Sequence, residues 1–259
     1  MIYIKSIEDI NNLRIGGKIS ANIMNNALKM VVPGVSTFEI NEKIEKLMKK
    51  EGVVPWFKEI DNYPYATCIS VNEAWIHGMP SKYKLKHGDI VSIDLGVKYG
   101  KYYIDHCWTV VATNSHSDNP MLDLNHDDSD IAKFLKVGVE SLEKAISNFV
   151  EGLRVGDISS TMQQTVENAG YSVVREYTGH GVGIKAHEDP LIACYGTKGA
   201  GELLKNGMVF AIEVMYAIGN SKIVVGNDGW TVSTKDKKIS GMFEHTVALT
   251  ENGPEILTI

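Results

Sequence analysis

The spacing of apolar residues in the first fifty positions predicts two amphipathic helices. In residues 6–31, apolar side chains recur every three or four positions and Ser6 is a suitable N-cap, although Gly16 and Gly17 weaken the middle. A second helix is expected after a Pro-Gly turn, with Thr37 as its N-cap. The chain is therefore expected to open with a helix pair.

After this pair, residues 53–113 change to short runs rich in apolar and β-branched residues, which is typical of strands. The runs are V-V-P-W-F, A-T-C-I-S-V, D-I-V-S-I-D-L-G-V and Y-Y-I-D-H-C-W-T-V-V-A. The polar stretch 114–130 is expected to be an exposed loop. Helical spacing returns at about 129–150 and 157–169, and strands follow again. The pattern predicts an α+β fold.

The order of elements is matched by a repeat in the sequence. The segment K-H-G-D-I-V-S-I-D, residues 86–94, aligns with K-N-G-M-V-F-A-I-E, residues 205–213, in its lysine, glycine, apolar positions and final acid. Upstream, residues 34–53 resemble residues 152–171 at nearly the same offset. Chance similarity is the alternative, but the two halves look like related modules.

The repeat leads to an expectation for the whole chain. Residues 1–259 are expected to form a single domain with pseudo-repeat halves at about 1–125 and 126–259. A cleft would then lie between equivalent strands, and Asp94 and Glu213 would face each other across the pseudo-twofold axis.

Four carboxylates and one histidine lie in or beside the predicted strands. Asp94 ends I-V-S-I-D, and Asp105 follows in Y-Y-I-D. His180 lies in T-G-H-G-V-G, Glu213 in V-F-A-I-E and Glu244 in M-F-E-H-T. A carboxylate at the end of an apolar strand must be solvated, paired or bound to a metal. This oxygen-rich set suits two divalent ions that share carboxylates.

Three of these residues also have a structural alternative. Asp94 could be a strand-end turn residue, His180 a turn histidine among glycines, and Asp105 an ordinary surface acid. The odd spacing of the two aspartates would place them on opposite faces of one continuous strand. A hairpin turn around Gly100 would reset that register. The duplicated acid at Glu213 favours the metal-site interpretation.

Composition narrows the class of protein. With 259 residues and 44% hydrophobic content, the chain can form a sizeable core, and no run reaches the roughly 18 apolar residues of a membrane helix. The N-terminus does not resemble a signal peptide. A net charge of −6 without a basic cluster argues against nucleic-acid binding. Cys68, Cys107 and Cys194 form no metal or disulfide pattern, so a cytoplasmic protein with reduced thiols is expected.

Seven strings occur in a consistent order and spacing across nearly the whole chain. They are S-V-N-E-A-W-I-H-G, I-D-L-G, Y-T-G-H-G-V-G, A-H-E-D-P, G-M-V-F-A-I-E, D-G-W-T-V-S-T-K-D and F-E-H-T. With them the chain resembles the methionine aminopeptidases of the type I, bacterial kind, within the pita-bread group of metallopeptidases. The resemblance implies two pseudo-symmetric α/β halves around a curved, mainly antiparallel sheet. The extra N-terminal domain usual in the group's prolidases is not expected.

The resemblance also implies roles for particular residues. The ligands of two divalent ions (Co, Mn, Fe or Zn) would be Asp94, Asp105, His180, Glu213 and Glu244. His77 and His187 would contact the substrate and take part in catalysis together with Glu213. Tyr63, Cys68 and Trp230 would line the pocket for the first side chain.

The implied activity is removal of the N-terminal methionine from nascent proteins and peptides, by a metal-bridging hydroxide that attacks the first peptide bond. The expected partners are N-termini of nascent polypeptides, with ribosome contact left open and a monomer expected. No nucleic acid or membrane partner is expected. Two alternatives stay open: an aminopeptidase of this fold with another N-terminal specificity, and a relative that has lost catalysis and only binds.

The chain departs from the family pattern near the expected site. Ile104 stands where a glycine is usual, Val214 replaces a proline, and Ala186 replaces a pocket phenylalanine. Ile60 replaces an aromatic pocket residue, and Phe57 is a candidate to restore lost volume. We expect a somewhat roomier pocket that still prefers methionine.

Overall fold

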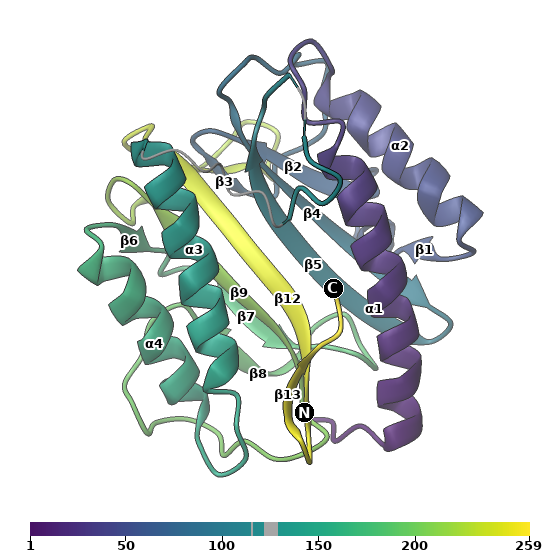
Figure 1. Cartoon of the computed structure of the whole chain (residues 1–259), viewed down its shortest axis with the longest axis vertical. Helices are drawn as coiled ribbons and strands as arrows, with labels where there is room; N and C mark the ends of the chain where they lie inside the picture. Colours follow the sequence, from purple (N-terminus) through teal and green to yellow (C-terminus); the bar gives the residue numbers. More distant parts are fainter. Residues whose placement is uncertain (115, 122–128) are drawn as a thin grey trace.

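The helices of the chain come in two pairs, and each pair is followed by strands (Figure 1). The structure is a computed structural model that describes residues 1–114, 116–121 and 129–259. The helices are α1 (Ile7–Leu28), α2 (Thr37–Lys50), α3 (Asp130–Ser147) and α4 (Val155–Asn168), and a short 3-10 helix, η1, spans Trp56–Glu59. The sequence predicted this order. No helix in the described ranges is both long and apolar enough to span a membrane.

The strands of the described residues form a ten-stranded sheet and a three-stranded sheet. The larger holds β1 (Val54–Pro55), β2 (Thr67–Val71), β4 (Ile90–Tyr99), β5 (Tyr102–Val111), β6 (Ser172–Val173), β7 (Thr178–Gly181), β8 (Glu188–Ala193), β9 (Val209–Ala217), β12 (Ser240–Thr250) and β13 (Gly253–Ile256). Its path runs β1-β4-β5-β12-β9-β7-β8, and each of these neighbouring pairs is antiparallel. The smaller sheet holds β3 (Ala74–Ile76), β10 (Ile223–Val225) and β11 (Val232–Thr234).

Both N-terminal helices begin with a capping box. The Ser6 hydroxyl accepts a hydrogen bond from the backbone N–H of Asp9, which confirms Ser6 as the cap of α1. The cap of α2 is Ser36, so the expectation of Thr37 was wrong by one residue. Ser36 accepts from the N–H of Glu39, and the Glu39 carboxylate accepts from the N–H of Ser36 at 2.8 Å. A serine three residues before a glutamate satisfies two helix-end donors at once.

The two glycines in the middle of α1 allow close packing. A Cβ on Gly17 would lie 2.2 Å from the carbonyl oxygen of Leu257, and one on Gly16 would lie 2.4 Å from Cδ1 of Ile104. Any larger residue would push the helix off the sheet and off the C-terminal segment. The glycines expected to weaken the helix therefore bring it into contact with the core.

Two expectations for the first strand region have different outcomes. The run V-V-P-W-F was expected to be a strand, but only Val54–Pro55 pairs with β4, and the chain then turns into η1. The expected hairpin between β4 and β5 is confirmed, because Tyr99 pairs with Tyr102 and Gly100 has a φ of 58°. The polar loop predicted at 114–130 falls in part on residues 115 and 122–128, which lie outside the described residues.

In the described residues, one face of the large sheet carries no α-helix, and this face is called the helix-free face below. In Figure 1, α1 and α3 lie over the same face of the sheet. Ile104 of β5 packs against Gly16 of α1, and Tyr216 of β9 and Phe243 of β12 lie against Gly138 of α3. Because successive strand residues point to opposite faces, the neighbours of Ile104, Tyr216 and Phe243 project to the side away from these helices.

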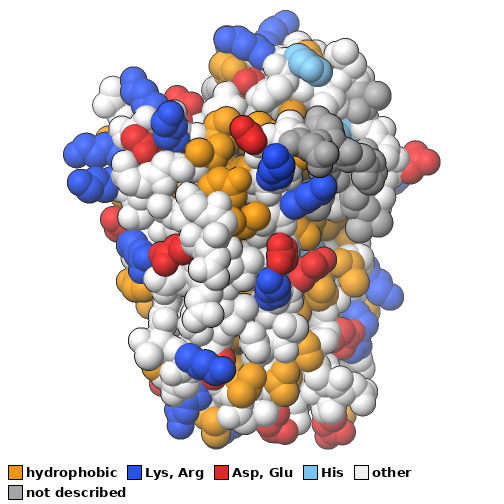
Figure 2. Space-filling model, turned by 60° about the vertical axis from the view of Figure 1, so that its left-hand side comes forward, with side chains coloured by type: hydrophobic (Ala, Val, Ile, Leu, Met, Phe, Trp, Pro, Cys, Tyr) orange, Lys and Arg blue, Asp and Glu red, His pale blue; other side chains and the backbone are white. Residues whose placement is uncertain are grey.

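The outer face on the side of α3 and α4 has a mixed surface. Figure 2 shows basic and acidic side chains across the coloured part of this face, with apolar groups between them.

Candidate metal centre and active site

Strand pairing places one row of side chains across the helix-free face. Asp94 of β4 pairs with Cys107 of β5, Cys107 pairs with Glu244 of β12, and Glu244 pairs with Glu213 of β9. Cys68 of β2 extends the row beyond Asp94. Directly paired residues of antiparallel strands project to the same face. Three carboxylates from three strands therefore meet above one line of the sheet.

A second row, two residues away from the first on each strand, adds the aspartate and the histidine. His180 of β7 pairs with Ala211 of β9, and Ala211 pairs with Thr246 of β12. The Thr246 hydroxyl donates to the carbonyl of Asp105 at 2.7 Å and accepts from its N–H at 2.9 Å. The row ends with Nε2 of His180 lying 3.8 Å from Oδ2 of Asp105. The five residues predicted from the sequence are thus adjacent.

These side chains suit a divalent cation. Asp105, His180 and Glu244 are buried, and each offers a ligand atom within 4.8 Å of the other two. Nδ1 of His180 lies 3.0 Å from the Gly181 carbonyl, which can only accept, so Nδ1 carries the proton and Nε2 is free for a metal. Oδ1 of Asp94 and Oε2 of Glu244 are buried and accept no hydrogen bond from the described residues. A cation would satisfy both oxygens.

The pKa values of the clustered residues also favour a bound cation. Burial, with repulsion from Asp105, raises the pKa of Glu213 to about 8, and burial raises the pKa of Asp105 to about 7. The pKa values of Asp94 and Glu244 are also raised, first by burial and then by the neighbouring carboxylates. Burial lowers the pKa of His180 to about 4, so its ring is neutral near pH 7. Bound cations would offset the repulsion among these acids.

A cavity of about 320 Å³ opens above the two rows. It is lined by every residue that the sequence proposed for the site, namely His77, His187, Asp94, Asp105, His180, Glu213, Glu244, Tyr63, Cys68 and Trp230. The lining combines carboxylates with aromatic side chains. Such a cavity can hold an apolar side chain beside a charged group.

Two histidines flank this cavity from different elements. His77 directly follows β3 and has a φ of 56°, a left-handed backbone conformation that few residues other than glycine, asparagine, aspartate and histidine adopt. The centroid of its ring lies 5.6 Å from the ring centroid of Tyr177 and 6.5 Å from that of Trp230. His187 lies on the connection between β7 and β8, is exposed to solvent, and has its ring 4.4 Å from that of His180.

Sequence reasoning missed several residues of the cavity wall. Met215 lies two residues after Glu213, and Met242 two residues before Glu244, so both point to the same face as those acids. The period of two in a strand could have found both. Tyr177 was part of a quoted string but received no role.

Trp56 is another cavity residue that sequence reasoning did not identify. Its indole N–H donates to the Ile104 carbonyl at 3.0 Å, and its ring lies 5.5 Å from that of His187, edge to face. A Cβ on Gly96 would lie 2.1 Å from the indole nitrogen, so the glycine of I-D-L-G makes room for this ring. Ala186 packs against the same aromatic cluster. No sequence pattern pointed to this arrangement.

The departures from the family pattern fall on two sides of the sheet. The side chains of Ile104 and Val214 belong to the helix-facing rows, away from the cavity. Ala186 lies beside the cavity, where Trp56 and Phe57 fill the adjoining space. Residues of η1 therefore pack in the region next to the small side chain of Ala186.

The fold and the site together define a metallohydrolase. The model of metallopeptidase family M24 matches residues 11–251, and the chain belongs to this family. Methionine aminopeptidase 1 of Bacillus subtilis is 42% identical over 258 residues, covering 100% of this chain and 99% of the relative. The methionine aminopeptidase of Escherichia coli is 36% identical over 261 residues, covering 100% of this chain and 94% of its own.

Solved structures agree with the family. The crystal structure of methionine aminopeptidase from Thermotoga maritima matches with a TM-score of 0.92 at 42% identity, covering 100% of this chain and 99% of that one. Prolidase from Pyrococcus furiosus matches with a TM-score of 0.74 at 25% identity, covering 99% of this chain and 65% of the prolidase. The predicted pita-bread fold and the predicted metallopeptidase class are confirmed, and membership of the family implies a divalent metal.

Proposed function

We propose that this protein removes the N-terminal methionine from nascent proteins and peptides with the help of two divalent ions. The observation that carries the proposal is that one cavity is lined both by a buried cluster of metal-ligating side chains and by aromatic and apolar side chains. Full-length similarity to proteins named methionine aminopeptidase supports the choice of methionine.

The five clustered residues would hold the ions. Asp94, Asp105, Glu213 and Glu244 would offer carboxylate oxygens, and His180 would offer its free Nε2. When bound, such ions polarise the amide carbonyl and lower the pKa of water. The choice among Co, Mn, Fe and Zn depends on metal supply as well as on ligands.

Three residues are proposed to act on the reacting groups. Glu213, a carboxylate that lines the cavity, is proposed to take a proton and pass it to the leaving nitrogen. His187 would donate a hydrogen bond to the oxygen on which negative charge develops. His77, on the other side of the cavity, would contact the scissile amide. These roles use atoms that line the same cavity.

The aromatic wall is proposed to select the first side chain. Tyr63, Cys68 and Trp230 line the cavity together with Met215 and Met242. A flexible thioether packs well against aromatic rings and other sulfur-containing side chains, which supports methionine over a branched residue.

An aminopeptidase with a different first-residue preference is the second candidate, since Ala186 and Ile60 depart from the family pattern. We also propose a cytoplasmic monomer that acts on the N-termini of nascent chains. The three cysteines are free and buried, in keeping with a reducing compartment. Ribosome contact stays a prediction.

The test is hydrolysis of a Met-Ala-Ser peptide at increasing concentrations of each of the four metals. Wild type is expected to release methionine, and Asp105→Ala is expected to lose both activity and metal binding. Asp89→Ala is the matched control, because Asp89 is a buried carboxylate that bonds Tyr83 and Asn72 outside the cavity. A wild type that releases no methionine with any metal would overturn the proposal, and faster release from Leu-Ala-Ser would favour the second candidate.

A further inference from the structure

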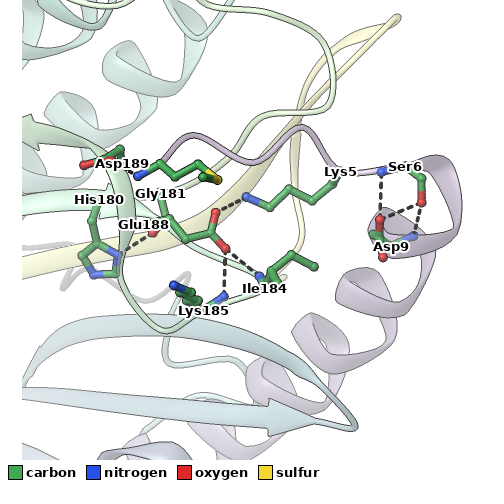
Figure 3. A network of polar contacts seen from close by, with 10 residues as sticks. Lys5, Ser6, Asp9, His180, Gly181, Ile184, Lys185, Glu188 and Asp189 are labelled. Carbon is green, nitrogen blue, oxygen red and sulfur yellow. Dashed lines mark hydrogen bonds and ion pairs between the residues drawn. The ribbon is translucent and has the colours of Figure 1, made fainter.

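A buried ion pair joins the N-terminal segment to the connection that carries His187. Nζ of Lys5 lies 2.5 Å from Oε2 of Glu188, and their side chains are 1% and 0% exposed (Figure 3). Lys5 precedes α1 and lies outside the residues matched by the family model, which begin at position 11. Glu188 is the residue directly after His187.

The second oxygen of Glu188 organises the connection itself. Oε1 accepts from the backbone N–H of Ile184 at 2.6 Å and from that of Lys185 at 2.9 Å. One carboxylate thus closes residues 184–188 into a tight turn, with Lys5 on its other oxygen. His187 lies within this turn, so the direction of its side chain follows from the geometry of the turn.

Both the backbone and the ammonium group of Lys5 are held by specific contacts. Its N–H donates to the carbonyl of Gly207 at 2.7 Å, next to the start of β9. Its side chain passes so close to Gly183 that a Cβ there would lie 2.9 Å from Cε of Lys5. Gly183 in turn accepts from the N–H of Tyr103 in β5. The backbone of Lys5 is therefore anchored at Gly207, and its side chain packs against Gly183 before it reaches Glu188.

His187 has few other restraints. Its side chain is exposed to solvent, and its ring contacts are the edge of Trp56 and the ring of His180. The neighbouring pair between the Met1 amine and Asp189 is exposed, and an exposed pair contributes little. The buried pair holds Glu188, which closes the turn, against the N-terminal segment.

A buried ion pair is a poor means of adding stability, because removing two charges from water costs about as much as their attraction returns. Its better-attested use is to select one arrangement of the chain. We propose that Lys5 is a positioning residue for His187 and acts through Glu188. The catalytic part of this inference rests on the proposed function.

The main test compares Lys5→Met with Arg14→Met in the full-length protein. Arg14 forms an ion pair with Glu255, far in sequence from the connection that carries His187, so its loss controls for breaking an ion pair of the N-terminal region. Lys5→Met is expected to lower kcat for Met-Ala-Ser by roughly tenfold to a hundredfold, the effect of misplacing a catalytic group by about 1 Å, with KM changed less than about twofold. Arg14→Met is expected to keep both values.

A second readout needs no metal and no activity. The imidazole NMR signal of His187, assigned with a His187→Gln variant, is expected to shift or broaden in Lys5→Met and to stay unchanged in Arg14→Met. If wild type releases no methionine, the proposed function fails, and this signal still tests the positioning.

Glu188→Gln covers the case in which Lys5→Met does not fold, since glutamine keeps the shape of the carboxylate. Glu188→Gln is expected to change kcat and the His187 signal in the same way as Lys5→Met. Because both substitutions act through one contact, the Lys5→Met/Glu188→Gln double variant is expected to have a kcat no lower than that of either single variant. A lower Tm with wild-type kcat and an unchanged His187 signal would overturn the inference and leave the pair as a purely structural contact.

Discussion

Glu213 and Glu244 lie directly opposite each other on β9 and β12, both buried and both on the helix-free face of the sheet. Like charges in this position destabilise a sheet. The sequence repeat aligns Glu213 with Asp94, which lies in the same row on the other side of Glu244 and Cys107. The sheet therefore tolerates a line of acids at its centre, which is reasonable if cations compensate them.

This arrangement predicts a pH-dependent effect of metal on stability. In the metal-free protein the pKa of Asp105 is raised to about 7 and that of Glu213 to about 8, mainly by burial. Unfolded carboxyls titrate near pH 4, so the folded state holds extra protons between about pH 4 and pH 8. The stability from these groups is fully present below about pH 4 and is lost as the pH rises to about 8.

Divalent metal replaces those protons, so its benefit should grow with pH. We expect the rise in Tm on adding excess Mn²⁺ to EDTA-treated protein to be larger at pH 8 than at pH 6, as measured by calorimetry. The variant Asp105→Asn/Glu213→Gln serves as the control and is expected to respond weakly at both pH values. An equal rise for wild type at pH 6 and pH 8 would contradict this account.

His77 allows the side chain to be tested separately from the backbone. Its φ of 56° suits asparagine better than alanine, because asparagine tolerates the left-handed region. His77→Asn is expected to keep the wild-type Tm and to lower kcat by about tenfold or more. His77→Ala should lose the same activity and also lower the free energy of unfolding by about 1 kcal/mol. Unchanged kcat in both variants would remove His77 from the reaction.

Substituting alanine for Gly17 is expected to destabilise the protein, although alanine is normally the better helix former. Replacing a glycine inside a helix with alanine normally stabilises by up to about 1 kcal/mol. Here the new Cβ would lie 2.2 Å from the carbonyl oxygen of Leu257. Gly17→Ala is therefore expected to destabilise by about 1–3 kcal/mol in urea unfolding. Ile15→Ala, at a partly exposed position of the same helix, is the comparison and should cost less.

Strand periodicity and the sequence repeat were sufficient to predict the acids of the site. The acids were recognisable because each interrupts an apolar strand, and the period of two then places them on one face. Trp56 could not be found this way, because its position depends on η1 and on the space left at Gly96. Nor could Lys5, whose partner Glu188 is distant in sequence. Contacts between remote segments leave no local pattern.

The pocket near Ala186 gives a prediction about compensating volumes. Ala186 packs against the cluster of Trp56 and Phe57. Ala186→Phe alone is therefore expected to overpack this region, costing about 1–3 kcal/mol, and to displace the Trp56 ring from His187.

Combining Ala186→Phe with Trp56→Ala removes the clash while keeping an aromatic ring in the region. The double variant is expected to be more stable than Ala186→Phe and to recover part of its kcat/KM for Met-Ala-Ser, because the two positions share one volume. Trp56→Ala alone leaves a cavity and should accept a bulkier first residue, such as phenylalanine, better than wild type does. Additive effects of the two substitutions on stability and on kcat/KM would mean that the side chains do not compete for space, and that selection of methionine rests on Tyr63, Cys68 and Trp230.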